Sequence, residues 1–272
     1  PEEDFTTMFN AYKNGVISEE RMVEALTRIL GLKAKMGLHK KDREAFVPGP
    51  QVLMTELGKA EYKEVQKKIA EDSLTLVKYK DKDVLPLTPD RYKRIMIVRL
   101  KPAAGPMDFL MEAMGYGGGK NPAEVLCEKL NAKGFEAFIY ESPVDKMKKQ
   151  IAEGQKPSID LYFAGKNAIA DFVKDMDLVL TVCDVANGRP AFGLSKGGGE
   201  IPWYVFEVPV VVVGVGAPTM LADLPQARTY INTYDSKEFT MDALVEQLMA
   251  GPEAFKGQDP IDSFCGLFDS HL

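Results

Sequence analysis

Val208-Pro-Val-Val-Val-Val-Gly-Val215 is the stretch of sequence that decides the fold. Its valines form a near-continuous apolar run, without the alternation of a strand that has one face in water. Such a run is typical of a central strand that is buried on both sides in a parallel sheet. The run is also far too short to cross a bilayer. We therefore predict a buried central strand here, and the rest of the fold is read outward from it.

Further short apolar segments lie on both sides of this strand, and helical patterns lie between them. The predicted strands are Ile95–Val98, Phe135–Tyr140, Leu178–Cys183 and Thr229–Thr233. The predicted helices begin at Asn121-Pro122 and Pro143 and cover Ala168–Met176 and Thr240–Met249. Strands that alternate with helices indicate a parallel sheet with helices on its faces. The fold class is therefore α/β, with a mostly parallel sheet flanked by helices.

The N-terminal part has a different pattern. Ser18 is a good helix N-cap, apolar residues then recur at helical spacing, and Gly37 can end the helix. Residues 39–57 contain Pro48, Gly49 and Pro50 and are predicted to be an extended linker, while 58–77 form a second amphipathic helix. We expect three parts: terminal helices at 1–38, the linker at 39–57 and an α/β sandwich domain at 58–272.

Composition excludes several classes of function. The formal net charge of -6 argues against a surface for nucleic acid or anionic membrane. The three cysteines are far apart, and the two histidines lack partners at metal-ligand spacing, so we expect neither a disulfide framework nor a metal site. We expect no cofactor. No segment has the pattern of a signal peptide or a membrane span, which favours a cytoplasmic location.

Two glycine-rich segments are candidate loops for chemistry. Gly115-Tyr-Gly-Gly-Gly-Lys120 lacks the spacing of a phosphate-binding loop, and we interpret it as a surface loop. Ser195-Lys-Gly-Gly-Gly-Glu200 ends in a carboxylate. Glu200 is a candidate for the acid of the carboxyl pair that a glycosidase needs. The alternative is that Glu200 only complements the dipole of a short helix that follows it.

A polar cluster follows the predicted strand that ends at Cys183. It consists of Asp184, Asn187 and Arg189. In open parallel sheets, ligands collect at the carboxyl ends of the strands. We therefore predict that these three side chains bind substrate or contact a neighbouring domain. The alternative is structural: Asn187-Gly188 forms a turn, and Asp184 accepts bonds from nearby backbone.

Four groups of residues, in this order along the chain, resemble the C-terminal region of glycoside hydrolase family 3. The first group is Gly15-Val-Ile-Ser-Glu-Glu-Arg21 with Arg28-Ile-Leu30 and Gly37-Leu38, which is similar to the last helix of the family's barrel. The second is Ser73-Leu-Thr-Leu-Val-Lys78 with Leu85-Pro-Leu87, similar to the start of its second domain. The others are Val210–Pro218 with Thr229–Tyr234, and Ala243–Leu248 with Phe255-Lys-Gly257.

The resemblance implies a retaining exo-β-glycosidase with a catalytic (β/α)8 barrel and an α/β sandwich as second domain. The short ending is more similar to the β-N-acetylhexosaminidase branch, in which no acid/base residue comes from the second domain. In the β-glucosidase branch a Glu of that domain is the acid, and Glu200 is the candidate. The Asp nucleophile of the barrel has no match in this sequence. We therefore expect an inactive chain whose partners are the barrel and a carbohydrate.

Two other classes of protein remain open at this stage. One is a stand-alone α/β module that binds carbohydrate or a partner without chemistry, and the other is a nucleotide-binding protein with a doubly wound sheet. The apolar stripe formed by Met22, Leu26 and Ile29 discriminates between a stand-alone module and part of a larger enzyme. If the stripe is exposed, it favours part of a larger enzyme over a stand-alone module.

Overall fold

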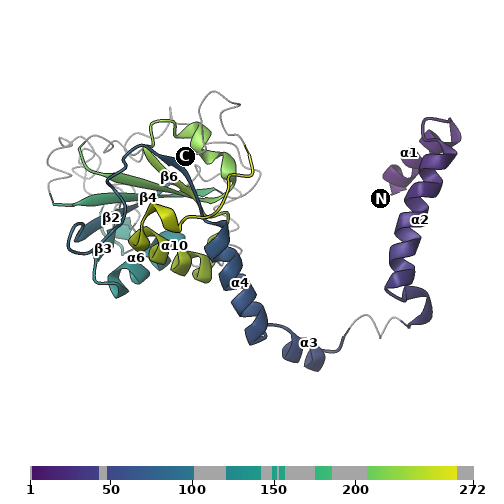
Figure 1. Cartoon of the computed structure of the whole chain (residues 1–272), viewed down its shortest axis with the longest axis horizontal. Helices are drawn as coiled ribbons and strands as arrows, with labels where there is room; N and C mark the ends of the chain where they lie inside the picture. Colours follow the sequence, from purple (N-terminus) through teal and green to yellow (C-terminus); the bar gives the residue numbers. More distant parts are fainter. Residues whose placement is uncertain are drawn as a thin grey trace. The chain divides into compact units, whose positions relative to one another are not determined.

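The computed structural model describes residues 2–42, 48–100, 121–141, 149–151, 153–156, 175–185 and 207–261 (Figure 1). The chain separates into two compact units, residues 1–60 and 61–272. The regular elements of the first unit, in its described residues, are helices, and the second unit holds the sheet. The predicted helices at Pro143 and at Ala168–Met176 lie almost entirely outside the described residues.

The sheet of the second unit has six strands, in the order β1-β6-β5-β4-β2-β3. The strands are β1 (Thr75–Tyr79), β2 (Arg94–Leu100), β3 (Glu136–Ile139), β4 (Leu178–Val185), β5 (Val210–Gly216) and β6 (Thr229–Asn232). All neighbouring strands are parallel except β1 and β6, which are antiparallel. The valine run forms β5, between β4 and β6, so the prediction of a mostly parallel α/β sheet is confirmed.

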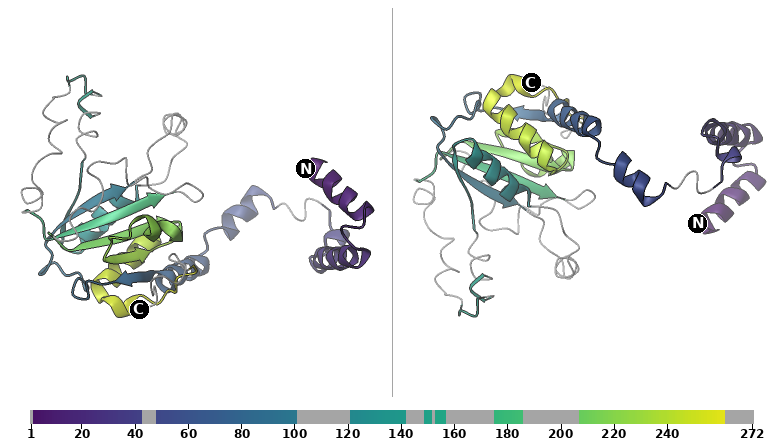
Figure 2. Two further views of the ribbon diagram at one scale, coloured as in Figure 1. Left: turned by 90° about the horizontal axis from the view of Figure 1, so that it is seen from above. Right: turned by 90° about the horizontal axis from the view of Figure 1, so that it is seen from below.

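The core lies on both faces of this sheet. Along β2, Ile95 and Ile97 belong to one buried cluster, and Met96 and Val98 belong to the other, as the alternation of a strand requires. Helices α6 (Pro122–Ala132) and α10 (Glu238–Ala250) pack against each other on the first of these faces (Figure 2). The second face is covered in part by the 3-10 helix η4 (Pro218–Asp223). β5 is buried on both faces, which explains its lack of polar residues.

Two predictions about the segment before the sheet were wrong. The helix predicted at 58–77 ends early, because α4 covers Ala60–Ser73 and β1 begins at Thr75. The alternation of buried residues in β1 and its pairing with β6 override the helical spacing. The predicted extended linker at 39–57 contains the 3-10 helix η1 (Leu38–Lys40) and α3 (Pro50–Glu56). Pro50 occupies the first turn of α3, where a missing N–H does no harm.

The first unit begins with α1 (Glu2–Lys13) and α2 (Glu19–Lys35). The predicted cap of α2 is confirmed: the backbone N–H of Arg21 donates to Ser18 Oγ at 3.2 Å, and Gly37 takes a left-handed φ of 71° after the helix ends. Neither α1 nor α2 nor α3 buries a residue. In the part of the chain that the structure describes, no helix is both long enough and apolar enough to span a membrane.

Candidate functional site at the carboxyl edge of the sheet

The parallel strands β2, β4, β5 and β6 end at one edge of the sheet, which we call the carboxyl edge. Along β2 and β4 the side chains of Ile95, Ile97, Leu180 and Val182 lie in the cluster under α6 and α10. Strand alternation places Arg99 and Asp184 on this same face, one step past the last buried residues. The core therefore ends at this edge in a pair of opposite charges.

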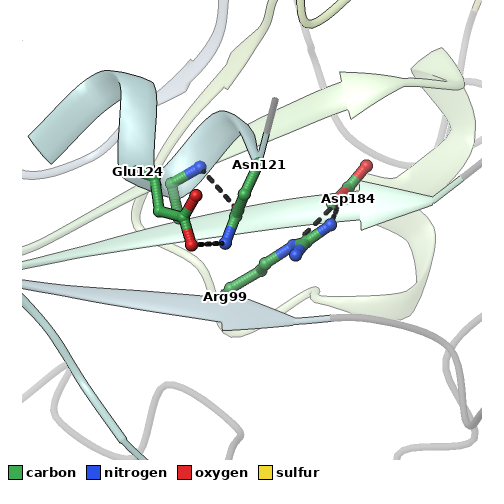
Figure 3. Close-up of polar contacts among 5 residues, drawn as sticks. Arg99, Asn121, Glu124 and Asp184 are labelled. Carbon is green, nitrogen blue, oxygen red and sulfur yellow. Dashed lines mark hydrogen bonds and ion pairs between the residues drawn. The ribbon is translucent and has the colours of Figure 1, made fainter. Parts of the chain in front are cut away.

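Arg99 and Asp184 bond to each other across the two strands. The Arg99 Nε donates to Asp184 Oδ2 at 3.0 Å, and Nη2 donates to the same oxygen (Figure 3). Their side chains are 23% and 25% exposed, so both charged groups still reach solvent. A charged pair at the end of a core can offer hydrogen bonds from its remaining polar atoms to a ligand that carries hydroxyl groups.

The start of α6 adds a second polar group at this edge. Asn121 caps the helix, because its Oδ1 accepts from the backbone N–H of Ala123 at 3.1 Å. Its Nδ2 donates to Glu124 Oε1 at 3.1 Å (Figure 3). Asn121 therefore caps the helix through its oxygen, while its side-chain nitrogen holds the Glu124 carboxylate beside the helix end.

The structure places one of the predicted site residues. Asp184 lies at the carboxyl end of β4, as the sequence indicated, and its described partner is the side chain of Arg99. Asn187, Arg189 and Glu200 lie outside the described residues, as do the segments Gly115–Lys120 and Ser195–Glu200. Sequence analysis missed Arg99. The sequence signal that could have found it is a charged residue that continues the alternation of Ile95 and Ile97 at the end of a buried strand.

A cavity of about 560 Å³ lies at the opposite edge of the sheet. The β1–β2 connection, the turn before β5 and Arg228 line it, and Asp81 bonds to Arg228 Nε there at 2.5 Å. Burial lowers the pKa of Lys78, and the charges of the lining residues Lys80 and Arg228 lower it further. Cations and carboxylates alternate along the wall, so the cavity has no single charge for a ligand to match.

The described residues contain no group of three or more His, Cys, Asp or Glu side chains that could hold a metal ion. The thiol of Cys183 is fully buried in β4, and burial raises its pKa far above the ordinary range, so it cannot act as a nucleophile at neutral pH. The carboxyl edge with Arg99 and Asp184 is thus the candidate site.

No protein-family model matches the chain. Among curated proteins, the chain is similar over its whole length to a β-N-acetylglucosaminidase/β-glucosidase of Cellulomonas fimi, with 31% identity over 275 aligned positions and 44% of that enzyme covered. Among solved structures, β-glucoside phosphorylase BglX superposes with a TM-score of 0.63 and 30% identity, over 99% of this chain and 43% of that one.

A glycoside hydrolase family 3 β-N-acetylglucosaminidase from Paenibacillus sp. str. FPU-7 shares the fold, with a TM-score of 0.50 and 18% identity over 93% of this chain and 41% of that one. The chain shares its α/β sandwich fold with these two enzymes. The chain matches the C-terminal region of glycoside hydrolase family 3, and the resemblance drawn from its motifs is confirmed. It spans less than half the length of the relatives it matches.

Proposed function

We propose that this chain is the supporting C-terminal region of a retaining exo-β-glycosidase, of the kind that removes terminal N-acetylglucosamine. The chain packs against the catalytic barrel and stabilises it, and the carboxyl edge of its sheet borders the sugar-binding site. The observation that carries the proposal is the end-to-end likeness to the Cellulomonas fimi β-N-acetylglucosaminidase/β-glucosidase. That relative is more than twice as long, since the chain covers 44% of it.

The exposed apolar residues of α1 and α2 support the proposal. Phe5 is 69% exposed, and Leu26 and Ile29 are 46% and 51% exposed, while Met22 is half-buried. These helices are amphipathic, and neither buries a residue. Apolar surface of this extent on a helix favours a protein partner over water. Within the unit of residues 1–60 these apolar side chains are not buried, and we propose that the barrel of the larger enzyme covers them.

In this proposal the chain by itself is inactive. The family's nucleophile is a barrel Asp, and no motif of this sequence matches it. A retaining glycosidase without its nucleophile cannot form the glycosyl-enzyme intermediate. The carboxyl edge then contributes binding rather than bond cleavage, with Arg99 and Asp184 as hydrogen-bonding groups toward sugar hydroxyls. Asn187 and Arg189, which follow β4 in sequence, are proposed to extend this edge.

The test is an assay of the 272-residue chain on 4-nitrophenyl β-N-acetylglucosaminide and 4-nitrophenyl β-glucoside. The chain alone is expected to release no nitrophenol above background. Mixed with the part of the Cellulomonas fimi enzyme that it does not cover, it is expected to bind that part and to raise its turnover. Turnover by the purified chain alone, which persists at constant specific activity through a further purification step, contradicts the proposal.

The second candidate function differs in the acceptor of the glycosyl group. A solved structure named β-glucoside phosphorylase BglX is 30% identical to this chain, so phosphate is a candidate acceptor in place of water. The two reactions differ in product, because phosphorolysis yields a sugar 1-phosphate and hydrolysis yields the free sugar. Activity of the mixed parts that requires inorganic phosphate and yields a sugar 1-phosphate favours this candidate.

The branch alternative, in which Glu200 is the acid/base of a β-glucosidase-type second domain, is tested in the same mixture. Glu200→Gln in this chain is expected to leave turnover of both substrates unchanged if the acid comes from the barrel. A loss of a hundredfold or more, on the order that removal of a general acid causes, favours the Glu200 alternative.

A further inference from the structure

The junction between α4 and β1 is capped by residues from far along the chain. A helix leaves its last four carbonyl groups without partners inside the helix. α4 ends at Ser73 without a glycine, since Leu74 and Thr75 follow it directly. Two of these carbonyls are bonded locally: Ser73 Oγ donates to the carbonyl of Ala70 at 3.2 Å, and the Thr75 hydroxyl donates to the carbonyl of Ser73 at 2.9 Å. The carbonyl of Glu71 takes its partner from elsewhere in the chain.

Three residues from the last 40 positions bond to the α4–β1 junction, and we call Tyr234, Gln247 and Gly257 the C-terminal clamp. Gln247 Nε2 donates to the carbonyl of Glu71 at 2.6 Å, and the backbone N–H of Gly257 donates to the carbonyl of Leu74 at 3.0 Å. The clamp therefore bonds both sides of the point where α4 becomes β1.

Tyr234 completes the set through Thr75. Its hydroxyl donates to Thr75 Oγ1 at 2.8 Å, and the Thr75 hydroxyl donates in turn to the carbonyl of Ser73 at 2.9 Å. Burial raises the pKa of Tyr234, and the Asp259 carboxylate adds to this, so the donor proton is retained at neutral pH. Tyr234 holds a φ of 62°, a left-handed conformation that is strained for a bulky residue and persists only where surrounding contacts impose it.

Gly257 approaches the junction more closely than any other residue type could. A Cβ built on Gly257 would lie 2.2 Å from the carbonyl oxygen of Ser73, 2.4 Å from Thr75 Oγ1 and 2.7 Å from the carbonyl oxygen of Leu74. Two of these atoms belong to backbone that is fixed by α4 and β1, so they cannot move aside. The requirement for glycine is therefore steric and not a matter of its φ angle.

Little else holds α4 against the sheet. Ala70 is its single buried residue in the described structure, whereas Tyr62, Val65 and Ile69 are 48%, 56% and 60% exposed. An alanine side chain contributes little apolar burial. Figure 1 shows the end of α4 beside α10, from which Gln247 reaches it. The hydrogen bonds of the clamp thus hold this helix end together with Leu74, the fully buried residue that follows it.

We infer that the C-terminal clamp is a conformational lock, which fixes the end of α4 to the sheet and opens as a local unit without unfolding the sheet. The lock sets the direction in which α4 leaves the sheet, and with it the orientation of the exposed Tyr62, Val65 and Ile69. Its opening is a local unfolding event, of the kind that native-state hydrogen exchange detects. The inference does not depend on the proposed function.

The test is hydrogen–deuterium exchange of the whole chain, read by mass spectrometry on peptides from 61–75 and on peptides from β4 and β5. Gly257→Ala is expected to speed exchange in 61–75 about tenfold or more, because the added methyl group has no space. Tyr234→Phe removes one hydrogen bond and is expected to speed exchange in 61–75 about fivefold. Exchange in β4 and β5 is expected to be unchanged in both variants.

The matched control is Gly31→Ala, since Gly31 lies in α2 with no atom within 4 Å of its Cβ position. It is expected to leave exchange in 61–75 at the wild-type rate. If Gly257→Ala does not fold, the milder Tyr234→Phe decides the question. Wild-type exchange in 61–75 in the folded variants overturns the inference, and so does an equal increase across 61–75, β4 and β5.

Discussion

Arg99 on β2 donates through both Nε and Nη2 to the same carboxylate oxygen of Asp184 on β4. The two residues lie 85 positions apart in the sequence, at the ends of neighbouring parallel strands on the face that packs on α6 and α10. The bond joins the two strands where the apolar core ends, so it has a structural role as well as the ligand-binding role proposed above.

Removing one charge of this pair is expected to lower stability. In Asp184→Asn the Arg99 guanidinium keeps its charge but loses its carboxylate, and the expected loss is about 1–2 kcal/mol in free energy of unfolding, since the pair is partly open to water. Urea denaturation of the chain followed by circular dichroism gives the value. Removing the other charge of the pair, in Arg99→Met, is expected to lower the free energy of unfolding by a similar amount.

The double variant Arg99→Met with Asp184→Asn tests whether the two losses come from one interaction. Coupled residues lose less together than the sum of the separate losses. We expect a coupling energy of about 1 kcal/mol. Additive losses contradict the importance of the bond between Arg99 and Asp184.

Gly214→Ala is expected to destabilise the sheet by about 1–3 kcal/mol through overpacking. A Cβ at this position would lie 2.1 Å from Tyr230 Oη and 2.9 Å from its Cζ, because Tyr230 crosses Gly214 on the buried face of β5. Adding Tyr230→Phe removes the closest atom and is expected to recover part of the loss. Thermal unfolding of the single and double variants is the measurement, and Tyr230→Phe alone is the reference.

Asn121→Ala is expected to cost about 1 kcal/mol, because the N-terminal turn of α6 loses the oxygen that accepts from the Ala123 N–H. Asn121→Asp keeps a capping oxygen at the positive end of the helix, but it loses the bond to Glu124 and places two carboxylates side by side, so its stability is expected to lie between those of Asn121→Ala and the wild type. Urea denaturation of both variants separates a cap from a general packing effect. Equal losses in both contradict the capping role.

Cys183 is expected to resist alkylation in the folded chain. Its thiol is fully buried and its pKa is raised by burial, so the reactive thiolate is absent at pH 8. Cys127 is half-buried, and burial also raises its pKa. Its alkylation is therefore expected to be slow at pH 8 and to become faster as the pH rises. Mass spectrometry after iodoacetamide treatment locates the label. Labelling of Cys183 at the rate of a free thiol, without denaturant, contradicts the burial.

The same raised pKa predicts how stability depends on pH. In the unfolded chain the thiol of Cys183 ionises at about pH 8.5, whereas in the folded chain it stays protonated well above this pH. The unfolded chain therefore binds fewer protons above about pH 8.5, and this group lowers stability as pH rises further. Cys183→Ala removes that contribution. The difference in free energy of unfolding between wild type and Cys183→Ala is expected to shift in favour of the variant between about pH 8.5 and 10.

The exposed face of α2 is expected to matter for association and not for stability. Leu26→Gln with Ile29→Gln changes two exposed side chains, so the thermal midpoint of the chain is expected to stay nearly constant. Binding to the remaining part of the Cellulomonas fimi enzyme is expected to weaken at least tenfold, as measured by calorimetry, because buried apolar area is lost at the interface. Lys35→Gln, on the other side of α2, is the control.

The fold could be predicted largely from local pattern. The valine run at 210–213 and the spacing of helices between strands indicated a parallel α/β sheet, and Ser18 and Asn121 marked helix starts that the structure confirms. β1 could not be found in this way. Its residues continue the helical spacing of α4, and they form a strand only because β6, more than 150 positions later, offers a free edge for pairing.

The candidate site, too, could be predicted from the sequence only in part. The sequence by itself indicated that Asp184 lies where a buried strand ends, because apolar run length and the polar residues after it are local properties, and the structure places it among the last paired residues of β4. Only the tertiary structure decided that Arg99 is its partner and that Gly257 must be a glycine. Both depend on which distant backbone lies within a few ångströms, and spacing along one segment carries no information about atoms that the fold brings against it.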